Sequence, residues 1–333
     1  MKILYPLSLI YNCGISLRAL LYKYKILKSY DFNIPIISIG NITMGGTGKT
    51  PMTMWLFNEL IKNKKKPCII TRGYNRQSKK LIIINKNYSN YTAKEVGDEP
   101  LMMIKKNKDI QMVINNNKIK AIEAAMKHLD IDTIILDDGF QSRYINRNFD
   151  VVMINAKEKD NHYNLFPMGA AREPIENISR ANALITNKGN INSDSDIYNI
   201  CLDNNINIFP AQNIFSMVDE NNKIIDDFEN VCGIAVCGIA DPASFLNTLN
   251  NYKIDIPAQF IREDHYDYKA KDLSKIYKSM GENNCNTIIT TWKDYYKIYP
   301  LNINNNKILI LDMKLDFPDN TLLSMIDKAI NEK

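Results

Sequence analysis

The hydrophobic pattern opens with a stripe of apolar residues at helical spacing. Ser8, Asn12, Ser16 and Lys23 fall on the side opposite this stripe. The apolar positions of the stripe are Ile10, Cys13, Leu17, Leu20, Leu21, Tyr24 and Leu27. We therefore predict that residues 1–30 form an amphipathic helix.

Basic residues accompany this helix, at Arg18, Lys23, Lys25 and Lys28. An apolar face with a basic fringe is suited to lying in the interface of a membrane. The alternative is a helix that packs its apolar face on its own domain. Between these two, the pattern favours a membrane-associating segment.

After residue 30, short apolar runs rich in β-branched residues alternate with helical segments. This alternation predicts a doubly wound, mostly parallel α/β sheet. We assign this domain to residues 31–212. The predicted strands are 34–39, 67–71, 81–84, 133–136, 151–155 and 183–186, and the predicted helices include 51–63 and 118–129.

The pattern changes near Gln212. Residues 213–218 and 223–225 flank a polar turn, Asp219-Glu220-Asn221-Asn222, which predicts a β-hairpin. Further strands near 233–236, 260, 288 and 308 alternate with helices at 242–249 and 270–280. We therefore predict a second, smaller α/β domain over residues 213–333, joined through this hairpin.

Composition narrows the function classes. A length of 333 residues suggests about two domains. The 42 Lys and Arg residues against 37 Asp and Glu residues give a net charge of +5, which is too small to indicate nucleic-acid binding. No central stretch is apolar enough to cross a membrane.

The six Cys show no paired framework, as is typical of a reducing compartment. We expect Cys232 and Cys237 to be small core residues.

The most specific chemical signal is a glycine-rich segment between a predicted strand and a predicted helix. It reads Gly45-Gly46-Thr47-Gly48-Lys49-Thr50. Glycines let backbone N–H groups converge on phosphate oxygens, and the helix N-terminus adds partial positive charge. We expect Lys49 on the β- and γ-phosphates and the Thr50 hydroxyl on Mg²⁺.

A second signal is a pair of carboxylates at the end of a predicted buried strand, Asp137 and Asp138. A strand end beside a phosphate loop faces the nucleotide, so we expect one of the two to reach Mg²⁺. The segment Asn187-Lys188-Gly189-Asn190 ends in Asn where a guanine-binding motif needs Asp. The pattern therefore favours ATP over GTP.

Three further clusters indicate chemistry beyond nucleotide binding. Asp98 and Glu99 lie in a turn, where the alternative role is capping a helix. His265 is flanked by carboxylates and could hold or relay a proton, or could simply be a surface residue. Arg172 could clamp an anionic group or form a structural ion pair.

Together these segments resemble the tetraacyldisaccharide 4′-kinase family, the lipid A 4′-kinases of Gram-negative bacteria. The most specific strings are Gly-Gly-Thr-Gly-Lys-Thr-Pro at residues 45–51 and Asp-Asp-Gly-Phe-Gln at residues 137–141. The family shares Thr43 in place of the first P-loop glycine. The other matches follow in order across most of the chain, at 71–74, 97–100, 172–174, 238–240, 264–265 and 293–294.

The chain departs from the family pattern at three positions. Ser142 stands where the family usually has His, Trp292 where it usually has Glu, and Tyr266 where it often has a second His. None of these three departures replaces a proposed catalytic residue.

The resemblance implies an ATP- and Mg²⁺-dependent kinase that phosphorylates the 4′-hydroxyl of a tetraacyldisaccharide 1-phosphate, a lipid A precursor. It implies a location on the cytoplasmic face of the bacterial inner membrane. It also implies that Asp98, helped by His265, accepts the proton of the sugar hydroxyl. Glu99 joins Asp137 and Asp138 on the metal side, and the matching motifs make Arg72, Gln141 and Arg172 candidates for substrate binding.

Two other function classes remain open from the residues alone. One is a P-loop GTPase or ATPase switch, or a metal-delivery protein, with the smaller domain as effector. Another is a membrane ATPase adaptor without a lipid acceptor. We infer no nucleic-acid partner and no obligate protein partner.

Overall fold

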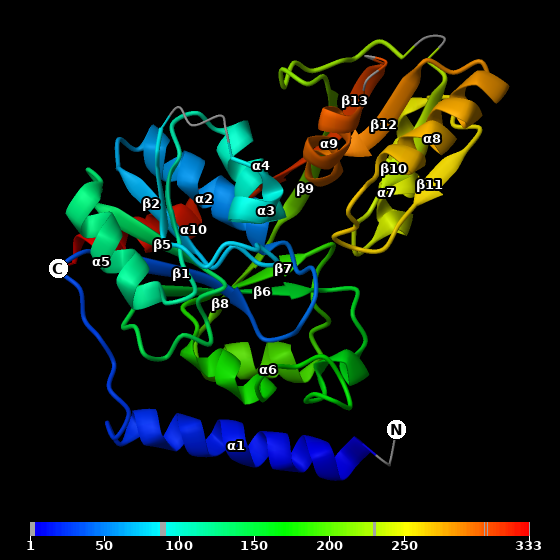
Figure 1. The fold of residues 1–333 in the computed structure, drawn as a ribbon. Coiled ribbons are helices and arrows are strands. Elements are labelled where there is room, and N and C mark those ends of the chain that lie inside the picture. The colour runs from blue at the N-terminus through cyan, green and yellow to red at the C-terminus, as the bar shows by residue number, and fades with distance from the viewer. Residues whose placement is uncertain (1–3, 87–90, 229–230, 303, 305, 333) are drawn as a thin grey trace.

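Two β-sheets organise the chain (Figure 1). The computed structural model describes residues 4–86, 91–228, 231–302, 304 and 306–332. The larger sheet has the strand order β3-β4-β2-β5-β1-β6-β7-β8, and its strands run parallel except for β3 beside β4. Its strands are β1 (Ile36–Asn41), β2 (Pro67–Thr71), β3 (Ile82–Asn85), β4 (Gln111–Ile114), β5 (Thr133–Asp137), β6 (Phe149–Asn155), β7 (Ala183–Asn187) and β8 (Asn207–Pro210).

This sheet confirms the predicted mostly parallel α/β arrangement. Its central strands β1, β2 and β5 are buried along their whole length, with apolar clusters on both faces. Strands buried on both faces are typical of parallel sheets covered by helices. The helices that belong to this part of the chain are α2 (Lys49–Lys62), α3 (Ala93–Val96), α4 (Asp98–Lys106), α5 (Lys118–His128) and α6 (Asp196–Asp203), with the 3₁₀ helices η2 (Asp160–Tyr163) and η3 (Ile175–Arg180).

The smaller sheet has the order β11-β10-β12-β13-β9, parallel except for β9 beside β13. Two separate apolar clusters form its core, one from each set of alternating strand residues. The strands are β9 (Gln212–Val218), β10 (Gly233–Cys237), β11 (Gln259–Ile261), β12 (Thr287–Thr291) and β13 (Lys307–Asp316). The helices are α7 (Pro242–Leu249), α8 (Ala270–Glu282) and α9 (Trp292–Ile298), with the 3₁₀ helices η4 (Asn250–Tyr252) and η5 (Tyr299–Leu301).

The predicted hairpin after Gln212 is present only as a short turn, and it does not provide the main partner of β9. Strand β9 pairs with β13 over its full length, from Gln212 opposite Asp316 to Val218 opposite Ile310. Residues 223–225 add one antiparallel bridge, between Val218 and Ile224, and two backbone hydrogen bonds, from Asp219 N–H to the Lys223 carbonyl and from Ile225 N–H to the Met217 carbonyl. The ten-residue β13 offers β9 a longer ladder than the three-residue segment after the turn, so the distant strand is the partner.

The last helix, α10 (Thr321–Asn331), returns to the larger sheet, where Leu322, Ile326 and Ile330 join its apolar cluster. The predicted division at residue 213 therefore does not hold for α10, because that helix completes the core of the other unit. In Figure 1 this helix, coloured red, lies beside the larger sheet, far from the smaller one.

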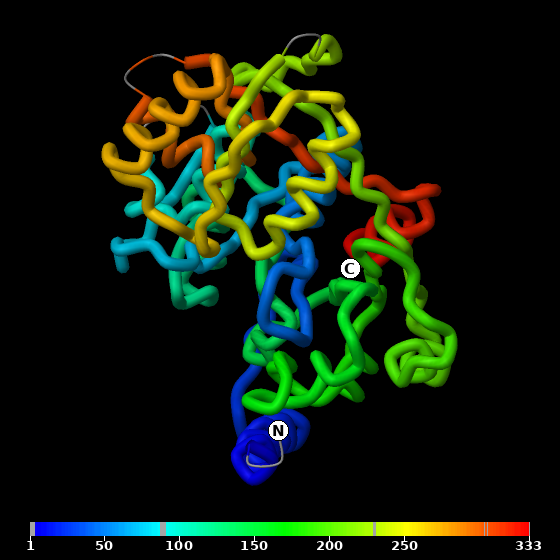
Figure 2. The backbone as a smooth tube through the Cα atoms, turned by 90° about the vertical axis from the view of Figure 1, so that its right-hand side faces the viewer, coloured from blue at the N-terminus to red at the C-terminus, as the bar shows by residue number. Residues whose placement is uncertain are grey.

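Helix α1 (Tyr5–Lys23) lies along the outside of the larger unit, and Figure 2 shows it end-on below the body. Ser8 is buried, and its hydroxyl donates to the carbonyl of Leu165. Ile10 and Leu17 are 70% and 58% exposed. The polar side of the helix therefore faces the protein and the apolar side faces outward. Among the described residues, no helix combines the length and hydropathy needed to cross a membrane.

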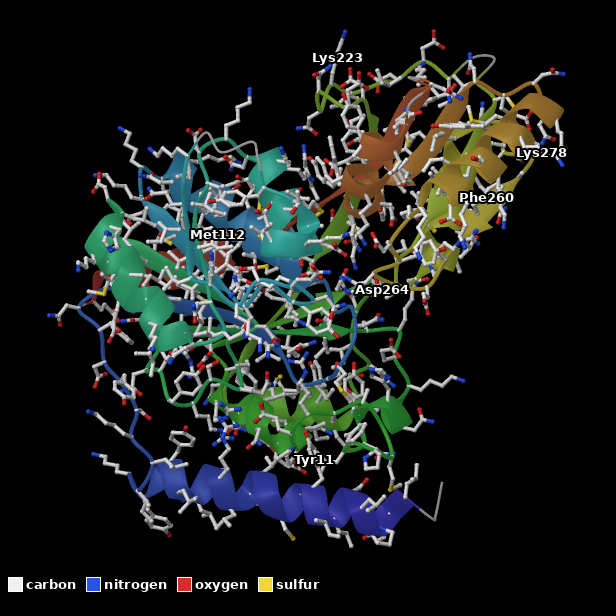
Figure 3. The ribbon with its side chains drawn as sticks, in the orientation of Figure 1. Tyr11, Met112, Lys223, Phe260, Asp264 and Lys278 are labelled. Atoms are coloured by element: carbon white, nitrogen blue, oxygen red, sulfur yellow. A yellow bond between two sulfur atoms is a disulfide. The ribbon has the colours of Figure 1, made fainter. Side chains whose placement is uncertain are left out.

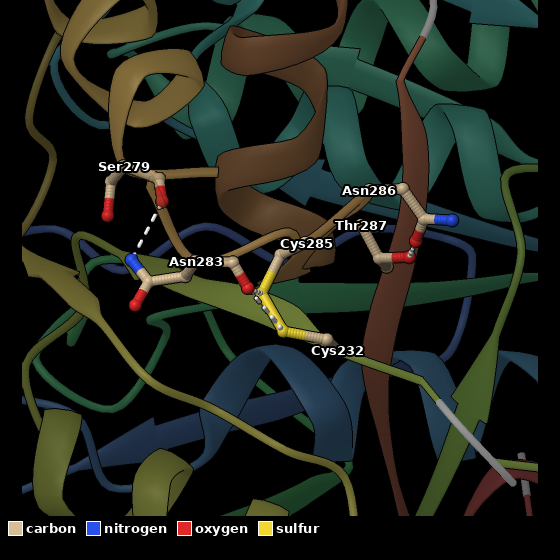
Figure 4. The surroundings of a disulfide bond; sticks show 6 residues. All are labelled: Cys232, Ser279, Asn283, Cys285, Asn286 and Thr287. Atoms are coloured by element: carbon tan, nitrogen blue, oxygen red, sulfur yellow. Dashed lines mark hydrogen bonds between the residues drawn. A yellow bond between two sulfur atoms is a disulfide. The ribbon is translucent and has the colours of Figure 1, made fainter. Parts of the chain in front are cut away.

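Two cysteines are paired, against the expectation from their spacing. Cys232 and Cys285 form a disulfide, with their Cα atoms 4.8 Å apart (Figure 4). They precede the neighbouring parallel strands β10 and β12, in which Gly233 lies opposite Thr287. The sheet register therefore brings together two residues separated by 53 positions. Cys237 is buried in the core, as predicted.

The return of α10 generates a stability prediction. Ile326 is fully buried, so Ile326→Ala should lower the free energy of unfolding by about 2–5 kcal/mol. Denaturant unfolding can be followed by Trp55 fluorescence, because Trp55 packs against Phe317 in the same cluster. All proteins compared would carry Trp292→Phe, which removes the other tryptophan. Ser324→Ala, at an exposed position of α10, is the control. Equal stability of the two variants would contradict the packing of α10 described here.

Candidate active site

The phosphate loop connects β1 to α2 at the carboxyl edge of the larger sheet. Gly45 and Gly48 adopt positive φ angles of 111° and 93°. A Cβ on Gly48 would lie 2.4 Å from the Asn187 side-chain nitrogen, so this position accepts only glycine. Gly48 also precedes α2 without any side-chain cap on the helix. The first N–H groups of a 14-residue helix are therefore left for an anion.

Asparagine side chains hold this loop in place. Asn41 donates to the Thr47 hydroxyl at 3.1 Å, and Asn187 donates to the Thr47 carbonyl at 3.2 Å. Asn213 in turn donates to the Asn187 side-chain oxygen at 2.8 Å. Asn187, part of the segment compared with a guanine-binding motif, thus serves the loop backbone in this structure.

Asp138 is surrounded by cations. Lys49 lies 3.7 Å from one of its oxygens, and the guanidinium groups of Arg72 and Arg172 each lie at 2.8 Å. Burial alone would raise the pKa of Asp138, but Lys49, Arg172, Lys118 and Arg72 together lower it to about 2. Of the two alternatives for Arg172, the ion pair is therefore present, and its partner is a carboxylate of the candidate site.

Asp137 has the opposite environment. It is buried, accepts a hydrogen bond from the Thr71 hydroxyl at 2.8 Å, and has no side-chain ion pair among the described residues. Burial, and after it the negative charges of Glu99 and Asp138, raise the pKa of Asp137 to about 6. The Thr50 hydroxyl donates to Glu99 at 2.7 Å. This hydrogen bond connects two of the predicted Mg²⁺ ligands, one on α2 and one on α4.

The chemistry of these donors fits a cation. Excess negative charge at Asp137 and Glu99 would be stabilised by a divalent ion, and Mg²⁺ takes one or two carboxylates together with phosphate oxygens and water. The part of the chain that the structure describes has no group of three or more His, Cys, Asp or Glu placed as a metal cage. A site completed by nucleotide phosphates needs no such cage.

Lys118 is a site residue that sequence reasoning missed. Its ammonium donates to the backbone carbonyls of Asp137 at 2.8 Å and Asp138 at 2.6 Å, and its side chain is almost fully buried. Burial lowers the pKa of Lys118 to about 8. It fastens the turn in which Asp138 has a φ of 48°. Because Lys118 begins a helix after a polar loop, its sequence context gives no signal that it is buried.

The other substrate candidates lie beside Asp138. Gln141 donates to the Asn41 carbonyl at 2.7 Å and to Glu173 at 2.9 Å. Arg172 contacts the Gln141 side-chain oxygen at 3.4 Å in addition to Asp138. The structure therefore brings Arg72, Gln141 and Arg172 into one polar surface next to the phosphate loop.

Asp98 and His265 come from different units and meet directly. Asp98 is the first residue of α4, and His265 Nδ1 lies 2.9 Å from its Oδ2. Lys297, from α9, lies 2.6 Å from the same oxygen and was not identified from the sequence. Burial raises the pKa of Asp98, but hydrogen bonds with His265 and Lys297 outweigh burial and lower it overall.

The contact between His265 Nε2 and Lys293 indicates which ring nitrogen of His265 carries the proton. The Lys293 ammonium, which also pairs with Asp264 at 2.6 Å, lies 3.2 Å from His265 Nε2. An ammonium has only donors, so Nε2 accepts and Nδ1–H donates to Asp98. Asp264 lies at the edge of the smaller unit that faces the larger one (Figure 3). The ring of Tyr74 is 5.4 Å from the imidazole.

The family departures take up structural roles. Ser142 lies 3.4 Å from the Lys118 ammonium. Trp292 is buried and stacks on Tyr296, and Tyr266 contacts Asp272. None of these three side chains contacts Asp98 or His265 through a hydrogen bond in the described structure.

Comparison with known proteins extends over almost the whole chain. The family model described as Tetraacyldisaccharide-1-P 4'-kinase matches residues 1–331. A tetraacyldisaccharide 4'-kinase of Pelodictyon phaeoclathratiforme is 32% identical over 89% of this chain and 86% of the relative. That of Wigglesworthia glossinidia brevipalpis is 34% identical over 83% and 72%.

A solved structure agrees with these relatives. The "apo" form of LpxK from Aquifex aeolicus in complex with ATP superposes with a TM-score of 0.80 at 28% identity, covering 99% of this chain and 98% of that one. Sequence and fold thus point the same way, and the chain belongs to the tetraacyldisaccharide-1-P 4'-kinase family.

Proposed function

We propose that this protein transfers the γ-phosphoryl group of ATP to the 4′-hydroxyl of a tetraacyldisaccharide 1-phosphate, a step of lipid A biosynthesis. The observation that carries the proposal is the contact between Thr50 and Glu99. It joins the helix of the phosphate loop to the first turn of α4, where the neighbouring Asp98 reaches His265. A phosphate site and a candidate base are therefore adjacent.

ATP is held by residues 45–50. The loop N–H groups and the α2 N-terminus receive phosphate oxygens, and Lys49 neutralises charge on the transferred group. The LpxK structure with ATP supports this assignment, since it covers nearly the whole chain. Lys49 is 3.7 Å from Asp138, a separation that leaves its ammonium able to engage phosphate as well.

Thr50, Glu99 and Asp137 would hold Mg²⁺, while Asp138 keeps its three cationic neighbours. When bound, the ion would neutralise charge on the phosphates during transfer. Asp137 supplies the uncompensated carboxylate, and Asp138 orients Lys49, Arg72 and Arg172. Of the predicted metal-side pair, Asp137 is therefore the direct ligand in this proposal.

Asp98 accepts the proton of the sugar hydroxyl. His265 and Lys297 both contact Oδ2, and no hydrogen bond to Oδ1 occurs among the described residues. Oδ1 is therefore the oxygen that receives the proton. A carboxylate with a lowered pKa is a weak base, so His265 supports the transfer by position: its Nδ1–H donates to Oδ2 and holds the carboxylate with Oδ1 free for the hydroxyl.

The membrane is the source of the lipid. Helix α1 presents exposed apolar side chains along the outside of the protein, and an interfacial helix would let the enzyme meet an acylated substrate without extracting it. Arg72, Gln141 and Arg172 would then bind the polar sugar phosphate. We place the enzyme on the cytoplasmic face of the inner membrane, where ATP is available.

The first test concerns Lys49. Lys49→Ala should reduce transfer of label from γ-labelled ATP into a disaccharide 1-phosphate lipid by roughly 10²-fold or more, because it removes a charge donor of the transition state. Lys62→Ala, at an exposed position of the same helix, should retain activity. Near-normal transfer by Lys49→Ala would show that the phosphate site is assigned to the wrong residues.

The second test is a double-mutant cycle on Asp98 and His265. Asp98→Ala and His265→Ala should each slow lipid phosphorylation strongly, while a nucleotide titration remains nearly unchanged. The double variant should be little worse than either single one, because residues that act as a unit are not additive. His162→Ala, outside the site, is the control. Multiplicative losses would mean that the two residues have independent roles.

The third test concerns α1. Deletion of residues 1–28 should move the protein from the membrane fraction to the soluble fraction. Ile10→Glu with Leu17→Glu should do the same while leaving the helix contacts with the body intact, since both side chains are exposed. Ile224→Glu changes an exposed apolar residue of the smaller unit and should leave the distribution unchanged. Membrane binding by the double Glu variant would show that another surface anchors the protein.

A further inference from the structure

A cleft of about 830 Å³ separates part of α1 from the larger unit. From α1 it is lined by Ser16, Ala19 and Lys23, and from the body by Arg143, Arg147 and Arg180. Its lining is therefore strongly basic, although the cleft takes no part in the phosphate site described above.

The basic groups of the cleft outnumber their acidic partners. Arg143 and Arg180 share one carboxylate, Glu173, at 3.3 and 2.6 Å. Arg147 is neutralised by Asp150 and donates to two backbone carbonyls, so its donors are used. With Lys23, four cations face two carboxylates, which leaves a charge of +2.

Two of these cations have donors to spare. Within the described structure, the Arg143 side chain donates one hydrogen bond, to Glu173. Arg180 donates to Glu173 and weakly to the Phe140 carbonyl; its Nε is buried, so the donors it has left for a ligand are those of its terminal guanidinium nitrogens. A guanidinium has five N–H donors, and a phosphate offers matching acceptors in a bidentate arrangement.

The position of the cleft indicates what kind of molecule enters it. A chain of contacts connects the cleft to the candidate active site. On the cleft side, Arg143 and Arg180 pair with Glu173. Glu173 accepts a hydrogen bond from Gln141, which lies beside the Arg172–Asp138 pair. Leu20 lines the cleft and is also exposed, next to Leu17 and Tyr24 on the outward apolar side of α1. An occupant can thus have a charged head in the cleft and apolar chains along α1.

We propose that this cleft binds the phosphodiester headgroup of an anionic membrane phospholipid that is not a substrate. The inference rests on the membrane association of α1 in the proposed function, but not on kinase activity. A bound headgroup would brace α1 against the body. That helix already contacts the substrate candidates, because Arg18 donates to the Gln141 carbonyl and the Tyr11 hydroxyl to the Arg172 carbonyl. Tyr11 points from α1 toward the body in Figure 3.

The test is lipid retention by the full chain in neutral detergent, measured by native mass spectrometry with phosphatidylglycerol or phosphatidylcholine. The wild type should retain one phosphatidylglycerol and no phosphatidylcholine. Arg143→Gln with Arg180→Gln should lower that retention at least tenfold. Ala19→Trp should do so as well, because it fills the cleft without changing a charge or the Glu173 cluster. Lys25→Gln removes a charge outside the cleft and should retain the lipid.

Three results would overturn the proposal. Retention of phosphatidylglycerol by Ala19→Trp would place the lipid elsewhere. An equal loss in Lys25→Gln would indicate general charge attraction rather than a site. One-for-one displacement of phosphatidylglycerol by tetraacyldisaccharide 1-phosphate would assign the cleft to the substrate's own phosphate. A failed kinase assay with intact retention would count against the proposed function and leave the lipid site standing.

Discussion

The site depends on the first turn of α4, where two consecutive carboxylates face two different partners. Successive residues of a helix project about 100° apart. Glu99 therefore reaches Thr50 beside the phosphate loop, while Asp98 reaches His265 and Lys297 on the smaller unit. The first turn of α4 thus fixes the spacing between the carboxylate that contacts Thr50 and the carboxylate that contacts His265, and no flexible loop lies between them.

The smaller unit holds α4 at both of its ends. At the first residue the contacts are those of Asp98, and at the last Lys106 pairs with the buried Asp312 of β13. Between them Met102 packs against the core of the smaller unit. In the sequence, α4 falls between β3 and β4 of the larger sheet. In the fold, it packs against both units. Helix α4 therefore links Thr50 of the larger unit to His265 and Lys297 of the smaller one.

The sequence predicted what is encoded locally. The phosphate loop, the Asp137–Asp138 pair and the alternation of strands and helices follow from contiguous patterns, and the structure brings the predicted site residues together. It could not predict contacts that join distant segments: Lys297 on Asp98, β13 beside β9, or α10 on the larger sheet. The Cys232–Cys285 pair belongs to the same class, because only the register of β10 and β12 makes the two residues neighbours. Lys118 was missed because a lysine at a helix start is ordinarily exposed, and only the carbonyls of the Asp137–Asp138 turn explain its burial.

Two adjacent carboxylates acquire different properties from the direction in which each side chain points. Asp138 faces Lys49, Arg72 and Arg172, which keep it ionised, so it serves as an anchor for cations. Asp137 faces Thr71 and the negative charge of Glu99, so its ionised form lacks compensation and its pKa rises to about 6. A divalent cation at Asp137 and Glu99 would supply the missing positive charge without disturbing the ion pairs of Asp138. In the proposed function, the turn fastened by Lys118 would therefore separate metal binding from the orientation of the cationic side chains, although the two carboxylates are neighbours in the chain.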